Sequence, residues 1–379
     1  MKSVVIAGYA RSPFHFAKKG GLAKVRPDDL AAQVVAALVE RAKIDPATIE
    51  DLIMGCAMPE GEQGLNIARL VGFLAKLPIS VAGTTVNRFC GSSMQSIHMA
   101  AGAIQMDAGD AFICAGIESM SRVPMTGFNP SPNPRLAKEY PAAYISMGQT
   151  AENLARKYQV TRAEQEKFAV ASHQKAAAAR AAGKFTDEIV PIKLADGSVV
   201  SEDGCIRPET NAAALAGLAS AFDAEGTVTA GTSSPLTDGA SATLVCTEEY
   251  AAKHNLDVLA RVRSIAVAGC PPEIMGYGPV PASHKALARA GVKSDQLDVI
   301  ELNEAFASQA IVSMRDLHLD ESKINLDGGA IALGHPLGAT GARITGKAAS
   351  LLKREGGKYA LSTQCIGGGQ GIATVLERA

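Results

Sequence analysis

The chain has 379 residues, of which 47% are hydrophobic and 20% are charged, and its formal net charge is −1. This length is enough for two or three domains with a large core, while the nearly balanced charge speaks against binding to nucleic acid. No apolar run approaches the ~18 residues of a membrane span and no signal-peptide pattern precedes the first strand, so we expect a cytoplasmic protein.

Strand and helix patterns alternate through the first third of the chain. The predicted strands cover residues 3–8, 49–55, 81–86 and 111–116, and the predicted helices begin near residues 27, 64 and 94. The strand at 81–86 is predicted to be buried. The strand at 111–116 is fully apolar, as expected at the centre of a mixed or parallel sheet. Strands that alternate with helices indicate an α/β protein.

The character of the chain changes near residue 120. The excursion 120–146 contains three prolines within Asn129–Pro134, which excludes regular structure there, and loops of this length are usually functional or interfacial. Thr161 and Glu164 form a capping-box pattern that opens a long Ala-rich helix. Residues 184–236 are irregular and polar, and the strand pattern returns at 240–245 and 260–267.

The second half of the chain weakly repeats the first. Residues 42–44, 49–50 and 52 match residues 290–292, 297–298 and 300 at one constant offset, each set between a helix and an apolar strand. Cys90 and Gln95 have the same spacing as Cys365 and Gln370, so we interpret these two pairs as counterparts. The pattern favours a duplicated α/β unit, in which equivalent turns from both halves would meet at one site.

The cysteine pattern indicates free thiols. The count is odd and no Cys-x-x-Cys pair occurs, which argues against a disulfide framework and against a zinc site. The seven positions are Cys56, Cys90, Cys114, Cys205, Cys246, Cys270 and Cys365.

Cys90 lies between a predicted strand and a predicted helix, in the stretch Thr85–Gln95. The N–H groups and the dipole at a helix N-terminus favour an anion, and for a cysteine the anion is the nucleophilic thiolate. Lowering the thiol pKa from ~8.5 by about two units would make the thiolate the main form. The alternative is a small buried hydrophobic residue, and this stretch alone does not decide between the two.

Three further motifs carry reactive residues. His335 lies between a glycine and a proline, and it is either the base of Cys90 or an ordinary turn histidine. Asn303 follows an apolar strand, and it either donates into a site or caps the next helix. Cys365 precedes three glycines whose N–H groups could face an oxyanion, and its thiol could transfer protons. The alternative for this last motif is a Gly-rich hairpin.

Together these stretches resemble the thiolase family. The resemblance rests on Asn87–Gln95, Asn303–Ala307, Gly328–Pro336 and Cys365–Gly371, which occur in the order of the family and span essentially the whole chain. It implies an α/β fold of two similar halves in a five-layered α-β-α-β-α arrangement, with a loop domain inserted in the first half. The expected division is 1–119 with 237–258 for the N-terminal half, 120–236 for the loop domain and 259–379 for the C-terminal half.

The resemblance also implies a role for each motif. Cys90 would be the nucleophile that carries the acyl group, His335 would activate it, and Cys365 would exchange protons with the α-carbon of the substrate. Asn303 would hold a water with His335 in one oxyanion hole, and the N–H groups of Cys90 and Gly367 would form the other. The implied reaction is CoA-dependent cleavage of a 3-ketoacyl-CoA, with coenzyme A as a substrate and no permanently bound cofactor or metal.

Contacts to CoA are implied at positions that match the family. They are Arg207, Phe222, Ala230, Ser234, Met275, Ala305 and Phe306. Ser146, before Met147, stands where biosynthetic acetoacetyl-CoA members carry histidine, which favours the degradative branch, as does the segment 275–281. Asp327 stands where many members have asparagine, and we expect at most an indirect effect on the site.

The expected partners are acyl-CoA, CoA and further copies of the chain. Members of the family are commonly tetramers or dimers, so we expect a homo-oligomer in which the excursion is the tetramerisation loop. Degradative members can also be the small subunit of a β-oxidation complex, and the sequence leaves this open.

There are three alternatives to CoA-dependent cleavage of a 3-ketoacyl-CoA. The nearest is an acetoacetyl-CoA thiolase that works in the biosynthetic direction. A condensing enzyme that uses malonyl groups also has Cys, His and Asn, but decarboxylation supplies its carbanion without a cysteine base, so Cys365 argues against it. A lipid- or CoA-binding module without activity would be expected to lack one of the two cysteines or the histidine.

Overall fold

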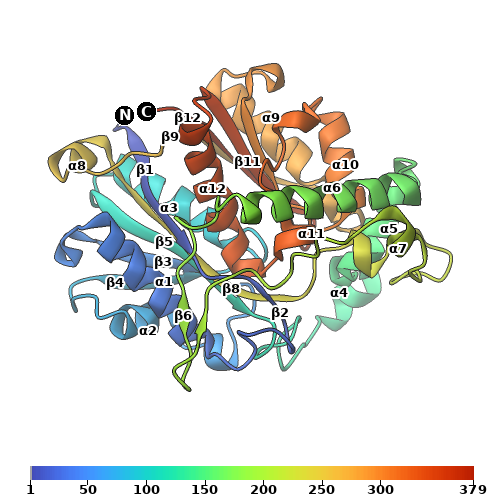
Figure 1. Ribbon diagram of the computed structural model, residues 1–379, viewed down its shortest axis with the longest axis horizontal. Coiled ribbons are helices and arrows are strands. Elements are labelled where there is room, and N and C mark those ends of the chain that lie inside the picture. The colour runs from blue at the N-terminus through green and yellow to red at the C-terminus, as the bar shows by residue number, and fades with distance from the viewer. Residues whose placement is uncertain (1) are drawn as a thin grey trace.

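The computed structural model describes residues 2–379, which form one large mixed sheet with helices packed against its faces (Figure 1). The strands of this sheet are β1 (Val4–Arg11), β2 (His15–Phe16), β3 (Asp51–Gly55), β4 (Ala82–Val86), β5 (Ala111–Ser119), β8 (Thr237–Thr247), β9 (Ala260–Gly269), β10 (Val299–Leu302), β11 (Tyr359–Ile366) and β12 (Gln370–Glu377). Their order is β10-β11-β12-β9-β1-β8-β5-β3-β4, with β2 paired to β8. A separate hairpin consists of β6 (Ile192–Lys193) and β7 (Val199–Val200).

The α-helices lie between strands of the sheet. They are α1 (Pro27–Ala42), α2 (Ile67–Leu74), α3 (Ser92–Gln105), α4 (Pro134–Glu139), α5 (Met147–Lys157), α6 (Arg162–Ala181), α7 (Ala212–Ala216), α8 (Glu248–Lys253), α9 (Pro279–Ala290), α10 (Ala307–Asp316), α11 (Ala330–Leu333) and α12 (Leu337–Arg354). Helices α4 to α7 all lie in the long segment between β5 and β8. Within residues 2–379 no helix is both long enough and apolar enough to cross a membrane.

The sheet consists of two similar halves that meet at β1 and β9. In the first half β3 is parallel to β5, β5 is antiparallel to β8, and β8 is antiparallel to β1. In the second half β10 is parallel to β11, β11 is antiparallel to β12, and β12 is antiparallel to β9. The seam between the halves is short, because Val5 and Ile6 of β1 pair with Arg261 and Ala260 of β9.

The constant offset seen in the sequence corresponds to equivalent positions in this repeat. The helices α1 and α9 both end before a residue in the left-handed conformation, Lys43 and Gly291. A short 3₁₀ helix then leads into β3 and into β10 at the same spacing. The predicted duplication is therefore confirmed.

One detail of the predicted duplication is wrong. Cys90 and Cys365 are not counterparts, because Cys90 precedes helix α3 whereas Cys365 lies in strand β11, whose equivalent is β5. The equivalent of the Cys90 turn is the turn that carries His335, which precedes helix α12. The equal spacing of the two Cys and Gln pairs is coincidental, since a match of two residues carries little information.

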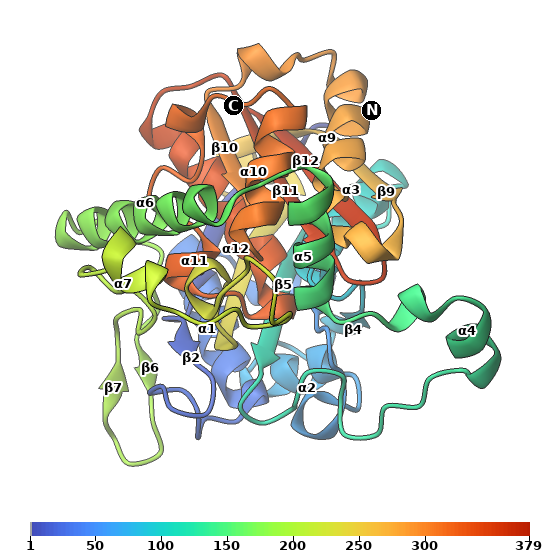
Figure 2. The ribbon, with the colours of Figure 1, turned by 90° about the vertical axis from the view of Figure 1, so that its right-hand side faces the viewer.

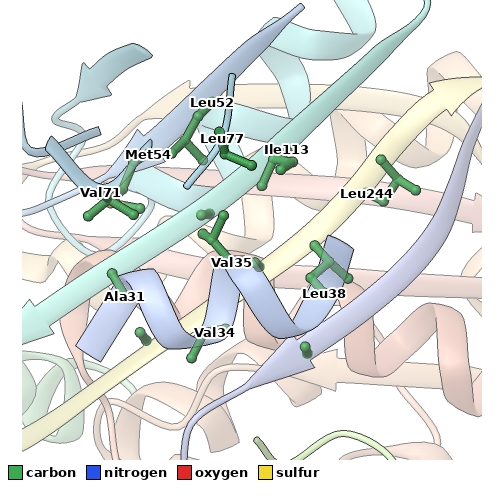
Figure 3. Close-up of a cluster of buried hydrophobic side chains, with 14 of the residues drawn as sticks. Ala31, Val34, Val35, Leu38, Leu52, Met54, Val71, Leu77, Ile113 and Leu244 are labelled. Carbon is green, nitrogen blue, oxygen red and sulfur yellow. The ribbon is translucent and has the colours of Figure 1, made fainter. Parts of the chain in front are cut away.

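The layers are separated by distinct hydrophobic clusters. Helices α1 and α2 pack on the outer face of the first half, where Val35, Leu38 and Leu52 lie in one cluster (Figure 3). Helix α3 covers the inner face of that half, and α12 covers the inner face of the second half. Helices α9 and α10 close the far side. Because neighbouring strand residues point to opposite faces, Leu52 belongs to the outer cluster and Ile53 to the inner one.

The prediction that residues 81–86 form a buried strand is only half right. The strand β4 exists, but its residues are exposed or partly exposed. The reason is its place at the end of the sheet order, where β3 pairs with one side and no described strand pairs with the other.

The long excursion after β5 leaves the body of the molecule, as Figure 2 shows for the segment that carries α4. The prediction that 129–134 lacks regular structure is correct for 129–133 and wrong for Pro134, which is the first residue of α4. The cap of this helix is the side chain of Asn133. The predicted capping box of Thr161 and Glu164 is also present at the start of α6.

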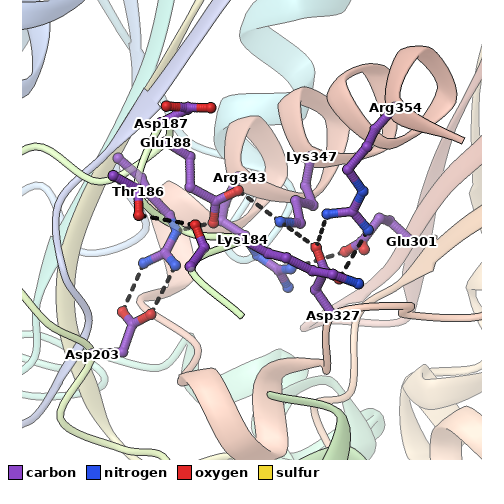
Figure 4. A network of polar contacts seen from close by, with 12 residues as sticks. Lys184, Thr186, Asp187, Glu188, Asp203, Glu301, Asp327, Arg343, Lys347 and Arg354 are labelled. Carbon is purple, nitrogen blue, oxygen red and sulfur yellow. Dashed lines mark hydrogen bonds and ion pairs between the residues drawn. The ribbon is translucent and has the colours of Figure 1, made fainter. Parts of the chain in front are cut away.

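A buried network of ion pairs joins α12 to the segment between α6 and β8 (Figure 4). Arg11 of β1 contacts Glu188 at 2.7 Å and Asp203 at 2.7 Å. Lys347 of α12 lies 2.8 Å from both Glu188 and Asp327. Burial by itself raises the pKa of Asp327, but hydrogen bonds from Arg354 and the charge of Lys347 hold it at about 2. Asp327 is therefore ionised and fixes α12 in place.

Replacing Lys347 by methionine is expected to destabilise the protein by about 3 kcal/mol, because it leaves two buried carboxylates short of a partner. Lys353→Met on the same helix is the matched control, since its ion pair with Asp257 is exposed and such pairs contribute about 0–1 kcal/mol. Denaturant unfolding of both variants measures the difference. Equal losses for the two variants would contradict the role given to the buried network.

Candidate active site

Cys90 lies on a strained turn between β4 and α3. Phe89, directly before it, has a φ of +42°, which is rare for a bulky residue. The turn is held by the Asn87 side chain, which accepts from the Phe89 N–H at 2.8 Å, and by Ser92 Oγ, which accepts from the Arg88 N–H at 2.9 Å. The predicted position of Cys90 at the start of a helix is confirmed, because α3 begins two residues later.

The pKa of Cys90 is shifted in the direction opposite to the one considered from the sequence. Burial raises the pKa of the Cys90 thiol to about 11, although the N–H groups of Gly367 and of Cys90 itself oppose the shift. The charge of Glu118 adds to the rise. The loss of solvation on burial thus has a larger effect on the pKa than the helix N-terminus, and Cys90 rests as a neutral thiol, which would need a base to act as a nucleophile.

His335 lies at the equivalent turn before α12. Gly334 adopts a φ of +107°, and a side chain there would collide with Thr237. The hydroxyl of Thr237 accepts from the His335 N–H at 3.0 Å. Burial lowers the pKa of His335 to about 3, assisted by the charge of Arg343, so the imidazole is neutral at physiological pH.

The hydrogen bonds of His335 indicate its tautomer. Its Nδ1 lies 2.6 Å from Thr340 Oγ1, which itself donates to the Pro336 carbonyl at 3.2 Å. Because the single hydroxyl proton of Thr340 is used on that carbonyl, we assign the imidazole proton to Nδ1. The lone pair is then on Nε2, the nitrogen that faces Asn303.

Asn303 follows β10 and points at His335. Its Nδ2 lies 3.5 Å from His335 Nε2, and its buried Oδ1 has no hydrogen-bond partner among the described residues. The alternative that Asn303 caps the next helix is wrong, because the N-cap residue of α10 is Phe306. A buried oxygen without a partner in a polar site is a place where a water binds.

Cys365 lies near the end of β11, before a tight hairpin into β12. Gly368 and Gly369 both have a φ near +80°, which requires glycine. Cys365 itself is fully buried in a cluster with Met275, Ala305 and Phe306. Burial raises the pKa of its thiol well above the usual value, and the proximity of Cys90 adds to the rise.

Direct contacts bring the two cysteine segments together. The Gln364 side chain donates to the Cys90 carbonyl, and Gly91 packs so closely on Ile366 that no side chain fits there. The helices α3 and α12 also touch near their N-termini, where Ser93 Oγ accepts from the Ala342 N–H at 2.8 Å. Leu337, two residues after His335, packs in the same apolar cluster as Cys90.

The positions expected to contact CoA fall into two groups. Ser234 donates to the Ala305 carbonyl, and the Phe222 ring meets the Phe306 ring edge-on at 5.9 Å, so these four residues adjoin the Cys365 cluster. Arg207 contacts a different part of the chain, because its guanidinium lies over the Phe16 ring. Ala230 is exposed and has no contact that decides its role. Ser146, which was not among these positions, is the N-cap of α5. Met147 lies beside Cys365 and Gly367.

Glu118 is a part of the site that the sequence analysis missed. Its buried carboxylate accepts from the N–H groups of Ala57 at 2.8 Å and Gly338 at 2.9 Å, and from the Gln63 side chain at 2.8 Å. It thereby ties the loop after β3 to the N-terminus of α12, where a negative charge is favoured. The available signal was a charged residue inside an otherwise apolar strand, and a buried charge needs partners.

Comparison with known proteins agrees with the resemblance to the thiolases. The family model described as "Thiolase, N-terminal domain" matches residues 4–249, and "Thiolase, C-terminal domain" matches residues 256–378. The chain therefore belongs to the thiolase family.

Individual relatives in this family align over their whole length. The chain is 50% identical to a 3-ketoacyl-CoA thiolase of Bacillus subtilis, covering all of both chains, and 49% identical to one of Marinobacter nauticus, covering all of this chain and 98% of the other. Among solved structures it is similar to the human mitochondrial 3-ketoacyl-CoA thiolase, with a TM-score of 0.91, 38% identity and coverage of 100% of this chain and 99% of that one. The same human enzyme in complex with CoA gives a TM-score of 0.92.

Proposed function

We propose that the protein is a 3-ketoacyl-CoA thiolase, which cleaves a 3-ketoacyl-CoA with CoA into acetyl-CoA and a shortened acyl-CoA. The observation that carries the proposal is the meeting of the Cys90 turn, the Cys365 hairpin and the Asn303–His335 pair in one place. The full-length identity to curated 3-ketoacyl-CoA thiolases supports the same reaction. Coenzyme A enters as a substrate, and the CoA complex of the human relative supports this.

In the proposed first step Cys90 attacks the 3-keto carbon. His335 accepts the thiol proton on Nε2, since that nitrogen carries the free lone pair. The two groups are neutral at rest, so the ion pair forms only while the nucleophile reacts. The N–H groups of Cys90 and Gly367, which both face the sulfur, are placed to stabilise an oxyanion on the carbon that it attacks.

The bond between the α- and β-carbons then breaks, and the acyl group stays on Cys90. The departing acetyl-CoA enolate is stabilised by His335 and by a water on Asn303, and it takes a proton from the Cys365 thiol. The Cys365 thiolate next removes the proton from the thiol of a second CoA, whose sulfur attacks the acyl-enzyme. Cys90 leaves as a thiolate and recovers its proton from His335, so the cycle closes without a metal or a redox cofactor.

The site residues also support a place for CoA. We propose that the pantetheine chain of CoA enters between Ser234 and the segment Asn303–Phe306. It would pass over Met275, Ala305 and Phe306, which pack beside Cys365. Phe222 stands at the exposed edge of this cluster. Arg207 and Ala230 would contact the outer part of the CoA molecule, which carries the phosphates. The guanidinium of Arg207 would bind a phosphate there through charge-assisted hydrogen bonds.

We propose the degradative direction, in fatty-acid β-oxidation or a similar pathway, for the protein in the cytoplasm. Ser146 supports this branch, because its side chain caps α5 and offers no imidazole to an acetoacetyl substrate. The alternative is an acetoacetyl-CoA thiolase that works in synthesis. A role as a subunit of a β-oxidation complex is compatible with both.

We propose that the protein is a homo-oligomer, either a dimer or a tetramer. Each chain would consist of an N-terminal half (1–119 with 237–258), a loop domain (120–236) and a C-terminal half (259–379). The free edge of β4 and the exposed Phe73 and Ile79 beside it support pairing with a second copy. The excursion with α4 would supply the tetramer contact. The return of the chain to the sheet at Thr237 supports the boundary of the loop domain.

The test is CoA-dependent cleavage of 3-ketoacyl-CoAs with four to sixteen carbons. Cleavage of the longer substrates is the expected result and would place the protein in the degradative branch. Activity on acetoacetyl-CoA alone would select the alternative. Absence of cleavage at every length by an enzyme whose Cys90 still takes up an acyl group would contradict the proposed function.

A further inference from the structure

Arg88 contacts both halves of the site. Its Nε donates to Gln95 Oε1 at 2.9 Å, and its Nη1 donates to Gln370 Oε1 at 2.9 Å. Gln95 lies in the first turn of α3, directly after the Cys90 turn, and Gln370 begins β12, directly after the hairpin that follows Cys365. One planar guanidinium therefore joins the segment of the first cysteine to the segment of the second.

The backbone of Arg88 belongs to the strained turn itself. Its N–H donates to Ser92 Oγ, and its carbonyl accepts from the Gly91 N–H at 2.9 Å. A displacement of the Arg88 side chain would therefore also shift the backbone of the turn that holds Cys90. Because the Cys90 and Cys365 segments are in direct contact through Gln364, a shift of one turn changes its distance from the other.

The contacts indicate that Arg88 acts through its hydrogen bonds rather than its charge. Both side-chain partners are neutral amides, and no ion pair involves Arg88 among residues 2–379. Burial lowers the pKa of His98, on the side of α3 that faces β12, and the charge of Arg88 adds to this shift. The charge that acts on Cys90 is that of Glu118. A lysine would keep the charge but could not donate in two fixed directions.

We propose that Arg88 is a positioning residue that sets the separation of Cys90 and Cys365 by bridging Gln95 and Gln370. The inference rests on the proposed function, in which cleavage of the carbon–carbon bond needs both cysteines. Acyl transfer from acyl-CoA to Cys90 expels a thiolate, which leaves readily even without a proton from Cys365, so this transfer depends mainly on Cys90. A misplacement of about 1 Å between reacting groups lowers a rate by about a hundredfold. The loss is therefore expected mainly in the carbon–carbon step.

The test compares two rates in four variants. One rate is kcat for cleavage of a 3-ketoacyl-CoA; the other is the single-turnover rate at which acetyl-CoA acylates Cys90, followed by mass spectrometry of the Cys90 peptide. In Arg88→Met and Arg88→Lys we expect kcat to fall by about tenfold to a hundredfold and acylation to change less than about threefold. Gln370→Leu removes the hydrogen bond between Arg88 and the segment that follows Cys365, so it should reproduce most of the loss of kcat. Gln95→Leu should cause a smaller loss of kcat.

Arg261→Met is the matched control, because Arg261 also donates from two nitrogens to one side chain, that of Glu248, but far from both cysteines in the sequence. Equal losses in both rates for Arg88→Met would overturn the proposal, as would full activity of Arg88→Lys. If Arg88→Met does not fold, Gln370→Leu provides the test, through the same comparison of the loss of kcat with the change in the acylation rate. Failure of the wild type to cleave any 3-ketoacyl-CoA would contradict both the proposed function and this inference. Cleavage by the wild type, with equal losses of kcat and of acylation in the variants, would contradict the inference alone.

Discussion

Cys90→Ala is expected to lower CoA-dependent cleavage of a 3-ketoacyl-CoA by at least about 10⁴-fold, because the thiol of Cys90 is the proposed carrier of the acyl group and alanine has no nucleophile. The variant should also fail to take up label from a radioactive acyl-CoA. The fold should be unaffected, since the thiol is replaced by a smaller group in a half-buried turn. Steady-state kinetics and recovery of label on the protein measure the two effects.

The matched control for this variant is Cys246→Ala. Cys246 is a free and buried thiol in β8, within the outer core, and it belongs to none of the motifs of the site. Its loss should leave turnover and labelling in place. Persistent labelling of Cys90→Ala would show that another residue is the nucleophile.

Cys365→Ala is expected to separate the two halves of the reaction. Loss of a general acid and base costs about 10²- to 10⁴-fold, so cleavage of the carbon–carbon bond should fall by this factor. Acylation of Cys90 by a simple acyl-CoA should continue at a reduced rate, because the departing CoA sulfur leaves readily as a thiolate even without a proton from Cys365, whereas an enolate does not. Alanine fills the same buried place beside Met275 and Phe306 with little change in packing.

Cys270→Ala serves as the comparison for the second variant, since Cys270 is a half-buried thiol that only donates weakly to the Met275 carbonyl. It should keep both rates. Normal cleavage by Cys365→Ala would remove Cys365 from the mechanism, and loss of acylation would show that it acts on Cys90 as well.

Much of the fold could be predicted from local sequence patterns. The apolar run 111–116 of β5, the capping box of α6 and the acidic first turn of α1 are signals carried by a few adjacent residues, and each was found in its predicted place. The exposure of β4 could not be predicted in this way, because burial depends on the position of a strand in the sheet rather than on its own residues. The same holds for the counterpart of Cys90, which was revealed by strand order and not by spacing.

The composition of the site was largely accessible from motifs, whereas its electrostatics were not. The sequence placed Cys90 at a helix N-terminus, which is correct, but the depth of the site decides the pKa and reverses its direction. The contribution of Glu118 depends on three N–H and amide donors from separate segments, and only the folded chain brings these together. Similarly, the sequence shows that Asp327 stands where many family members have asparagine, but only the folded chain shows that its carboxylate pairs with Lys347 and Arg354.

The equivalence of the Cys90 turn and the His335 turn has a consequence for the history of the molecule. A single ancestral unit that paired with its own copy would have brought two identical turns, each before its central helix, to a shared symmetry axis. In a molecule built from two fused copies of that unit the turns would be free to differ, so that one could carry a thiol and the other an imidazole. Cys365 lies on β11 rather than on either of these turns, so it stands outside the paired positions.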